Sequence, residues 1–137
     1  MASANVELVR SIFSDWERGH FTTAEWAHPQ IDYVIVGGPA PGRWAGVSGM
    51  WQGWRGVLDA WEELRFEVEE YRELDGERVL VLYRWTGRGK ASGVDLGAVQ
   101  AKGANLLHIR DGKVTRLVGY FERDRALADL GLAPEPD

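Results

Sequence analysis

The sequence predicts a single α+β domain in which helices cover one face of a curved, mostly antiparallel sheet. Apolar residues recur at helical spacing early in the chain, and from Leu64 onward they alternate with a period of two. Helices followed by a long antiparallel meander pack together on one face of the sheet. A sheet that bends around a long first helix forms a cone, and we expect its wide end to be a pocket. The length of 137 residues is typical of one domain, so we predict a domain over 1–132 and a disordered tail over 133–137.

The first part of the chain predicts two helices, a strand and a loop. Residues 4–18 form an amphipathic helix whose apolar face carries Val6, Val9, Phe13 and Trp16. A short helix capped by Thr22 or Thr23 is expected to reach Trp26, and Pro29 prevents its continuation. The β-branched and aromatic residues of 31–36 predict a strand. The glycines and prolines of 37–46 predict a loop.

The third helix has an unusual composition. Its apolar face is formed by Val47, Trp51, Trp54, Leu58 and Trp61. It also contains Gly49, Gly53 and Gly56, each of which costs on the order of 1 kcal/mol against alanine in a helix interior. Either close backbone packing or tolerance in a well-anchored helix explains these glycines. Because they leave room beside Trp51 and Trp54, we place both tryptophans on the pocket wall.

Four strands and a last helix complete the chain. The strands are expected over residues 64–74, 78–87, 94–109 and 114–121, and the helix over 124–130, ending at Gly131. Asp75-Gly76 joins the first two strands and Asp111-Gly112 joins the last two. An Asp-Gly pair between apolar runs is the strongest short signal for a β-hairpin, so the strands of each pair are predicted to be antiparallel neighbours.

Composition excludes several classes of function. The chain has 21 acidic and 16 basic residues, a net charge of −5, and no cluster of Lys or Arg longer than two, so nucleic acid is not an expected partner. Without cysteine, and with His20, His28 and His108 not spaced as ligands, we expect no metal and no cofactor. Residues 1–10 lack the apolar segment of a signal peptide, and 45% hydrophobic residues do not indicate a membrane protein. We therefore expect a cytoplasmic protein that does not bind membranes.

Seven tryptophans in 137 residues are the most unusual feature of the composition. Tryptophan is large and amphipathic, so this number indicates an extensive aromatic lining of a core, a pocket or an interface.

Four segments carry a resemblance to a known family. They are residues 28–33 (H-P-Q-I-D-Y), 44–61, 87–93 (G-R-G-K-A-S-G) and 110–127 (R-D-G-K-V at its start and Y-F-E-R-D-R-A-L at its end). In these segments the chain resembles SnoaL-like proteins of the nuclear-transport-factor-2-like superfamily, and the likeness covers nearly the whole sequence. The resemblance implies a cone-shaped, cystatin-like roll with helices on the concave side of a mixed sheet. The superfamily includes isomerases, epoxide hydrolases, polyketide cyclases and domains that only bind, so it does not imply one function.

The resemblance also allows the catalytic positions of the enzymes to be compared with this chain. The isomerase type uses a tyrosine and two aspartates, and those positions fall on Ile12, Ile35 and near Asn105. An isoleucine cannot transfer a proton, although Asn105 can donate a hydrogen bond to a ligand. Isomerase chemistry by that set of residues is therefore not expected.

The epoxide-hydrolase type matches more closely, because its tyrosine and arginine correspond to Tyr33 and Arg84. Its asparagine is replaced by Ile35, and its two aspartates fall on Thr86 and Gly119. The aspartate of the cyclase type also coincides with Gly119. Without those carboxylates no side chain at these positions activates water or protonates a leaving group.

We predict a ligand pocket built from residues of the first helix, the third helix and four strands. Its expected members are Trp16, Tyr33, Ile35, Trp51, Trp54, Arg84, Thr86, Asn105 and Gly119. Tyr33 is equally well explained as a core tyrosine with a satisfied hydroxyl. For Arg84 an ion pair within the protein is favoured over a ligand contact, because an arginine among Leu80 and Leu82 needs an acid, a carbonyl or an anion.

The strand over residues 78–87 predicts a homodimer. It is apolar on both faces, and helices on one side of the sheet can cover only one of them. We therefore expect a second subunit on the convex face, in contact with Val81, Tyr83, Trp85 and His108. The acidic run around Glu67 is expected to be a solvated strand face and helix end.

Three hypotheses follow for the function. The first is a protein that binds a small, largely apolar organic molecule, oriented by Tyr33, Arg84 and Asn105 against tryptophan walls. The second is an enzyme of polyketide-cyclase, isomerase or epoxide-hydrolase type that uses acids or bases elsewhere, such as Asp32, Asp95 or His108. The third is a dimerisation module whose cavity is filled by side chains. An open cavity above about 300 Å³ supports the first of these hypotheses, and a cavity that holds a carboxylate or histidine with a perturbed pKa supports the second. A collapsed core would contradict both.

Overall fold

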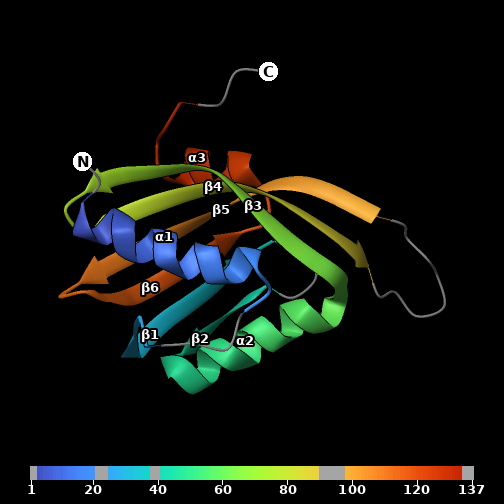
Figure 1. The fold of residues 1–137 in the computed structure, drawn as a ribbon, viewed down its shortest axis with the longest axis horizontal. Coiled ribbons are helices and arrows are strands. Elements are labelled where there is room, and N and C mark those ends of the chain that lie inside the picture. Colours follow the sequence, from blue (N-terminus) through green and yellow to red (C-terminus); the bar gives the residue numbers. More distant parts are fainter. Residues whose placement is uncertain (1–2, 21–24, 38–40, 90–97, 134–137) are drawn as a thin grey trace.

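The computed structural model describes residues 3–20, 25–37, 41–89 and 98–133, which form three helices and one six-stranded sheet (Figure 1). The elements follow the order α1 (Ala4–Glu17), β1 (Ala27–Val36), β2 (Gly42–Ala45), α2 (Gly46–Ala60), β3 (Trp61–Asp75), β4 (Arg78–Gly89), β5 (Ala98–Arg110), β6 (Lys113–Tyr120) and α3 (Arg123–Asp129). The predicted α+β class with a curved, mixed sheet is confirmed. The expected tail lies outside the described residues from position 134 onward.

The sheet has the strand order β2-β1-β6-β5-β4-β3, and β1 and β6 form its one parallel pair in the described chain. Both predicted hairpins are present. Asp111 and Gly112 have φ of 53° and 76°, the left-handed conformations that a tight hairpin turn requires. The turn between β3 and β4 consists of Gly76 and Glu77, one residue later than predicted, because Asp75 pairs with Arg78 as part of the ladder.

One expectation for the first half of the chain was wrong, and a second lies mostly outside the described residues. The predicted loop over 37–46 contains strand β2, which pairs with β1 so that Trp44 lies opposite Tyr33. Arg43 on β2 donates two hydrogen bonds to the Asp32 carboxylate, at 2.9 and 2.8 Å, and this exposed ion pair adds to the backbone pairing of β2 with β1. The predicted second helix falls mostly outside the described residues, and Trp26 lies in a turn that leads directly into β1.

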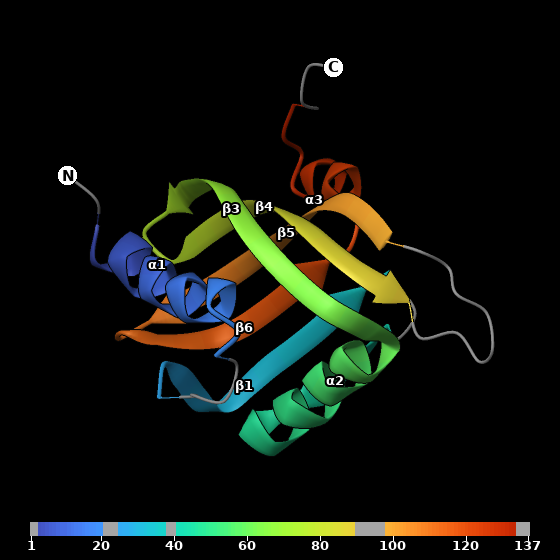
Figure 2. The same cartoon turned by 45° about the vertical axis from the view of Figure 1, so that its right-hand side comes forward.

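The helices cover both faces of the sheet rather than one. Helices α1 and α2 pack on the concave face, and Figure 2 shows α3 on the opposite side of the strands. The concave core contains Val9, Phe13, Ile31, Val57 and Val81, among others. The convex core joins Leu80 and Leu82 of β4 to Ala126 and Leu127 of α3. The second layer that β4 requires is therefore supplied in part by the C-terminal helix of the same chain.

The two faces of β4 are the reverse of those predicted. Val79, Val81, Tyr83 and Trp85 belong to the concave core, whereas Leu80 and Leu82 belong to the convex core. The physical reason is that β4 is apolar on both faces, so its alternation identifies two faces without indicating which one points inward. The pairing of Val81 with Asn105 places both on the concave face, and this register determines the orientation.

Trp44 explains two of the four glycines in α2. A Cβ atom on Gly53 would lie 2.7 Å from Cε3 of Trp44, and one on Gly49 would lie 3.2 Å from Cβ of Trp44. The helix therefore offers a flat surface on which the ring lies, so close packing is the correct explanation at these two positions. The space beside the glycines is filled by Trp44 rather than left open to the pocket.

We predict that Gly53→Ala destabilises the protein by about 1 kcal/mol, because the overpacking of about 1–3 kcal/mol exceeds the gain of about 1 kcal/mol in helix propensity. Urea unfolding measured by tryptophan fluorescence checks this value. In a Trp44→Leu background the same substitution should become neutral or stabilising, because the shorter side chain leaves room for the added methyl group. A stabilising Gly53→Ala in the otherwise unchanged protein would contradict the packing explanation.

Candidate functional site

The concave face encloses a pocket between α1, α2 and the strands. It is lined by Trp16, Tyr33, Ile35, Trp54, Val57, Leu64, Phe66, Tyr83, Trp85, Asn105, Leu117, Gly119 and Phe121. Almost all of these side chains are apolar or aromatic, which is typical of sites for small organic molecules.

The aromatic side chains of the wall contact one another in a continuous row. The rings of Trp16 and Trp54 are stacked at 5.6 Å and 20°, and those of Trp54 and Phe66 at 6.0 Å and 26°. Phe66 then meets Tyr83 edge to face at 5.2 Å. Offset stacking and edge-to-face contacts are the favourable geometries for aromatic pairs, so the rings of the wall stabilise one another.

Three neutral polar side chains, Tyr33, Tyr83 and Asn105, lie among the aromatic rings. The Tyr83 hydroxyl donates a long hydrogen bond to Oδ1 of Asn105 at 3.4 Å, and all three residues are buried. Burial raises the pKa of both tyrosines well above the ordinary value, and for Tyr33 the proximity of Tyr83 raises it further. Both hydroxyls therefore stay protonated at physiological pH and can donate hydrogen bonds.

Two glycines leave the space that this polar cluster occupies. A Cβ atom on Gly103 would lie 2.9 Å from Cε2 of Tyr83, so the tyrosine ring lies directly on the backbone of β5. A Cβ atom on Gly119 would lie 3.2 Å from Oδ1 of Asn105, which pairs with Gly119 across β5 and β6. The glycine at position 119 thus makes room for the amide.

No carboxylate or imidazole belongs to the pocket lining in the described part of the chain. Asp32 is bound to Arg43 in a bidentate ion pair, and Asp95 lies outside the described residues. His108 is partly exposed on the other face, where burial and Arg116 lower the pKa of its imidazole. The lining can therefore orient a ligand through neutral hydrogen bonds but supplies no group that exchanges protons near neutral pH.

The pocket is small in this structure. Its cavity volume is about 30 Å³, which is enough for one or two water molecules but below the volume of roughly 300 Å³ or more that ligand pockets have, so the open cavity expected for a ligand-binding protein is not found at this site. A second cavity of about 10 Å³ lies beside it. The two share Trp16, Tyr33, Trp54 and Leu117 as walls, and of these only Trp54 is not fully buried.

The structure brings together most of the residues predicted for the pocket. Those that line it are Trp16, Tyr33, Ile35, Trp54, Asn105 and Gly119, and Trp51 lines the smaller cavity beside it. Arg84 and Thr86 alternate with Trp85 and lie on the opposite face of β4. Arg84 binds Glu69 at 3.0 Å, the ion pair within the protein that the sequence favoured.

The residues that were predicted to form a dimer face lie on different faces of the sheet. Val81 is part of the concave core, and Tyr83 and Trp85 line the pocket. His108 alone lies where it was placed, on the convex face, partly exposed. The reversal of β4 accounts for all three displaced residues.

Several pocket residues were missed in the sequence. Leu117 lies two residues before Gly119 in β6, and Phe121 lies two residues after it, directly beyond the end of the strand. The alternation that placed Gly119 in the pocket therefore also identifies these two residues. Leu64 and Phe66 follow the same rule on β3. Tyr83 and Trp85 had no such signal, because both faces of β4 are apolar.

Neither a metal site nor a membrane-spanning helix is found in the described part of the chain. Among residues 3–20, 25–37, 41–89 and 98–133, no group of three His, Asp or Glu side chains lies close enough together to hold a metal ion. In the same residues no helix is long and apolar enough to cross a membrane.

The raised pKa values of Tyr33 and Tyr83 predict a loss of stability in alkali. Tyrosine in the unfolded chain ionises near pH 10. Below about pH 10 the two tyrosines therefore do not lower the free energy of unfolding. As the pH rises from there toward the higher folded pKa, the free energy of unfolding falls by up to about 1.4 kcal/mol per pH unit for each tyrosine. Tyr83→Phe should make the decline between pH 10 and pH 11 shallower, as measured by urea unfolding at each pH. Tyr71→Phe is the control, and its effect should be smaller because Tyr71 is only partly buried. An unchanged slope in Tyr83→Phe would contradict the burial of a protonated hydroxyl.

Comparison with known proteins identifies the family. The chain is similar to an NTF2-like protein of unknown function from Burkholderia pseudomallei, with 17% identity over 93% of this chain and 97% of the other and a TM-score of 0.76. It is also similar to TerC, co-crystallized with polyporic acid (20% identity, 95% and 98% covered, TM-score 0.70). A third similar structure is a proposed polyketide cyclase from Xanthomonas campestris pv. campestris (19% identity, 91% and 95% covered, TM-score 0.68).

These identities establish the fold alone. No curated protein matches the sequence. The model of the SnoaL-like domain matches residues 9–117, which is most of the chain. Together with the shared fold, this match shows that the chain belongs to the SnoaL-like domain family.

Proposed function

We propose that the protein binds a small, neutral and largely apolar organic molecule in the pocket of the concave face. The observation that carries the proposal is the composition of the wall, in which aromatic rings surround two protonated tyrosine hydroxyls and one amide. A flat, unsaturated ligand suits such a wall best, because in place of the Trp54 indole its faces can stack on Trp16 and Phe66, the two rings that Trp54 contacts.

The polar cluster indicates what kind of ligand oxygen is recognised. Tyr33 can donate a hydrogen bond through its hydroxyl and Asn105 through its amide nitrogen, whereas Tyr83, whose proton is directed at Oδ1 of Asn105, can accept one at its hydroxyl oxygen. A ligand carbonyl or hydroxyl therefore finds partners in the cluster. A carboxylate would lose its hydration without meeting a cation, because the described lining contains no Lys or Arg, so anions are disfavoured.

Ligand entry requires side chains to move, because the cavity holds only one or two waters. Trp54 is the best candidate, since it is one of the four residues that line both cavities and the one of those four that is partly exposed. Displacement of its indole would join both cavities and free the volume of a bicyclic ring. A planar bicyclic molecule is therefore the size of ligand that the opened site would accept.

The relatives support binding of small molecules more than one particular reaction. TerC was co-crystallized with polyporic acid, and another structure of the same fold is a proposed polyketide cyclase. An enzyme of cyclase, isomerase or epoxide-hydrolase type is the alternative from another class. The neutral lining favours binding, because such enzymes need an acid or a base beside the ligand.

Calorimetric titration with 2-naphthol tests the proposal, with 2-naphthoate as the matched anion. At pH 7 we expect 2-naphthol to bind with a Kd below about 1 mM and 2-naphthoate at least about tenfold more weakly, a difference of about 1.4 kcal/mol. Tyr83→Phe and Asn105→Ala should each weaken 2-naphthol binding about fivefold, the value of one hydrogen bond of about 1 kcal/mol. Tyr71→Phe, outside the pocket, should leave the Kd unchanged.

The proposal fails if 2-naphthoate binds as tightly as 2-naphthol. It also fails if Asn105→Ala binds both compounds as tightly as the unaltered protein does. Native mass spectrometry of the freshly purified protein provides a second test. It should reveal a co-purified neutral compound that is lost from Asn105→Ala but retained by Tyr71→Phe.

We also propose that two copies of the chain associate through the convex face. Helix α3 covers only part of this face, and Val34 and Val36 of β1 are partly exposed at the edge of the convex core. His108 lies on the same face. A second copy would cover these residues, whereas Val81, Tyr83 and Trp85 would take no part in the contact.

Light scattering coupled to size exclusion tests the dimer. At micromolar concentration we expect twice the mass of one chain, and Val34→Glu should give the mass of a single chain because it places a charge in the interface. Ser11→Glu, on the exposed surface of α1, is the control and should leave the dimer intact. A monomeric mass for the unaltered protein would overturn this proposal without affecting the proposed ligand.

A further inference from the structure

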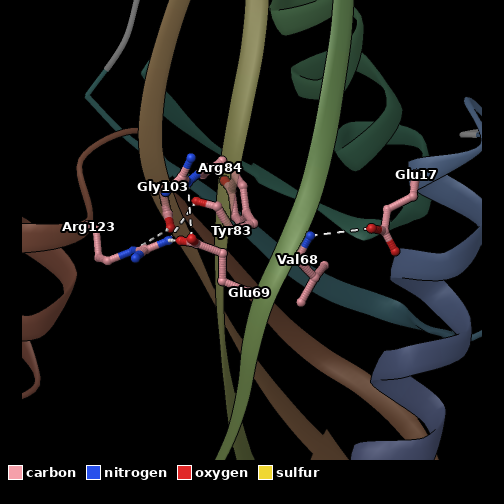
Figure 3. A network of polar contacts seen from close by, with 7 residues as sticks. All are labelled: Glu17, Val68, Glu69, Tyr83, Arg84, Gly103 and Arg123. Carbon is pink, nitrogen blue, oxygen red and sulfur yellow. Dashed lines mark hydrogen bonds and ion pairs between the residues drawn. The ribbon is translucent and has the colours of Figure 1, made fainter.

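A buried arginine on the convex side lies directly behind the polar cluster of the pocket. Arg123 is the first residue of α3, and only 4% of its side chain is exposed. Its Nη2 donates to the carbonyl oxygen of Tyr83 at 2.8 Å and to Oε1 of Glu69 at 2.7 Å, and its Nε donates to the carbonyl oxygen of Gly103 at 3.3 Å (Figure 3).

The position of Arg123 is unfavourable for the helix that carries it. A cation at a helix N-terminus opposes the macrodipole, and burial removes the hydration of the guanidinium. The side chain therefore stabilises the sheet, to which all its cited hydrogen bonds are made, rather than α3. What it gains there is a carboxylate and two carbonyl oxygens.

The carboxylate comes from a β-bulge in the edge strand. Val68 pairs with Tyr83 and Glu70 pairs with Leu82, so Glu69 is the extra residue of β3. Its carboxylate accepts from Arg123 and from Arg84, and the hydrogen bond from Arg123 is the main cause of its lowered pKa. On the concave side the Val68 amide donates to Glu17 of α1 at 3.3 Å, so the bulge is held from both faces (Figure 3).

The two carbonyl groups belong to the residues that shape the polar cluster. Tyr83 and Gly103 are direct partners across β4 and β5. On the concave side of the same pair, the Tyr83 ring lies on Gly103 and its hydroxyl reaches Asn105. Arg123 thus holds from behind the backbone that carries the hydroxyl into the pocket.

We infer that Arg123 is a positioning residue that fixes the Tyr83 hydroxyl against Asn105 through the backbone of β4 and β5. The planar guanidinium can reach both carbonyl oxygens and Glu69 at once because its donors diverge in one plane, whereas the ammonium of a lysine is a point donor on a flexible stem. The expected effect of Arg123 on ligand binding rests on the proposed function. Its effect on the positions of the Tyr83 and Asn105 side chains does not.

The experiment uses the full chain with 3-fluorotyrosine and ¹⁵N labels. It records the fluorine signal of Tyr83, assigned with Tyr83→Phe, and the side-chain amide signals of Asn105. Arg123→Lys should shift or broaden both sets of signals and weaken 2-naphthol binding several-fold. Leu127→Ala is the control for a merely structural role, because it loosens α3 in the convex core without touching either carbonyl. At an equal loss of thermal midpoint it should leave both sets of signals in place.

Glu69→Gln tests the same inference in a variant that keeps the arginine. Glu69 is 31% exposed and glutamine retains an acceptor, so the fold should persist and Arg123 should keep its bonds to the carbonyls. Unchanged signals of Tyr83 and Asn105 are expected even though the thermal midpoint falls. The inference is overturned if Arg123→Lys leaves both signals in place, if Leu127→Ala moves them equally, or if Glu69→Gln displaces them. If neither the unaltered protein nor any variant binds 2-naphthol, the proposed function fails. The positioning role still stands in that case, provided that the signals move in Arg123→Lys alone.

Discussion

The structure depends on strand β4 being buried on both faces. Leu80 and Val81 are both fully buried, yet they point to opposite sides of the sheet. A strand of this kind requires two layers of cover, and the chain supplies α1 and α2 on one side and α3 on the other. Because the concave layer is built from large aromatic residues that cannot fill the curved sheet completely, a small cavity remains beside Tyr83. The pocket is thus a consequence of the way β4 is covered.

The character of the pocket follows from what surrounds the cavity. Aromatic rings exclude water, and in this environment the hydroxyls of Tyr33 and Tyr83 stay protonated because ionisation would leave a buried charge. The charged group that hydrogen-bonds to the backbone of β4 is Arg123, which lies on the convex side and forms an ion pair with Glu69. The sheet therefore separates charge from the pocket, and on this ground we propose that the concave face recognises neutral molecules better than ions.

Much of the fold was predictable because local signals agreed with it. The apolar spacing of α1, the turn at Asp111 and Gly112, and the alternation of β1 and β6 all indicate one structure. The errors arose where a local pattern is symmetric or a contact is distant. The alternation of β4 fits either orientation, so Arg84 was assigned to the pocket and Tyr83 to the outer face. The glycines of α2 could not be explained without Trp44, and the role of Arg123 depends on a bulge in β3 that has no signal of its own in the sequence.

A crystal structure of the protein with 2-naphthol tests the central claim most directly. The account predicts a ring stacked against the aromatic wall with Trp54 displaced. The naphthol oxygen should lie within hydrogen-bond distance of Tyr83, Asn105 or Tyr33. Binding on the convex face, or a ring in the pocket whose oxygen points away from all three polar groups, would contradict it.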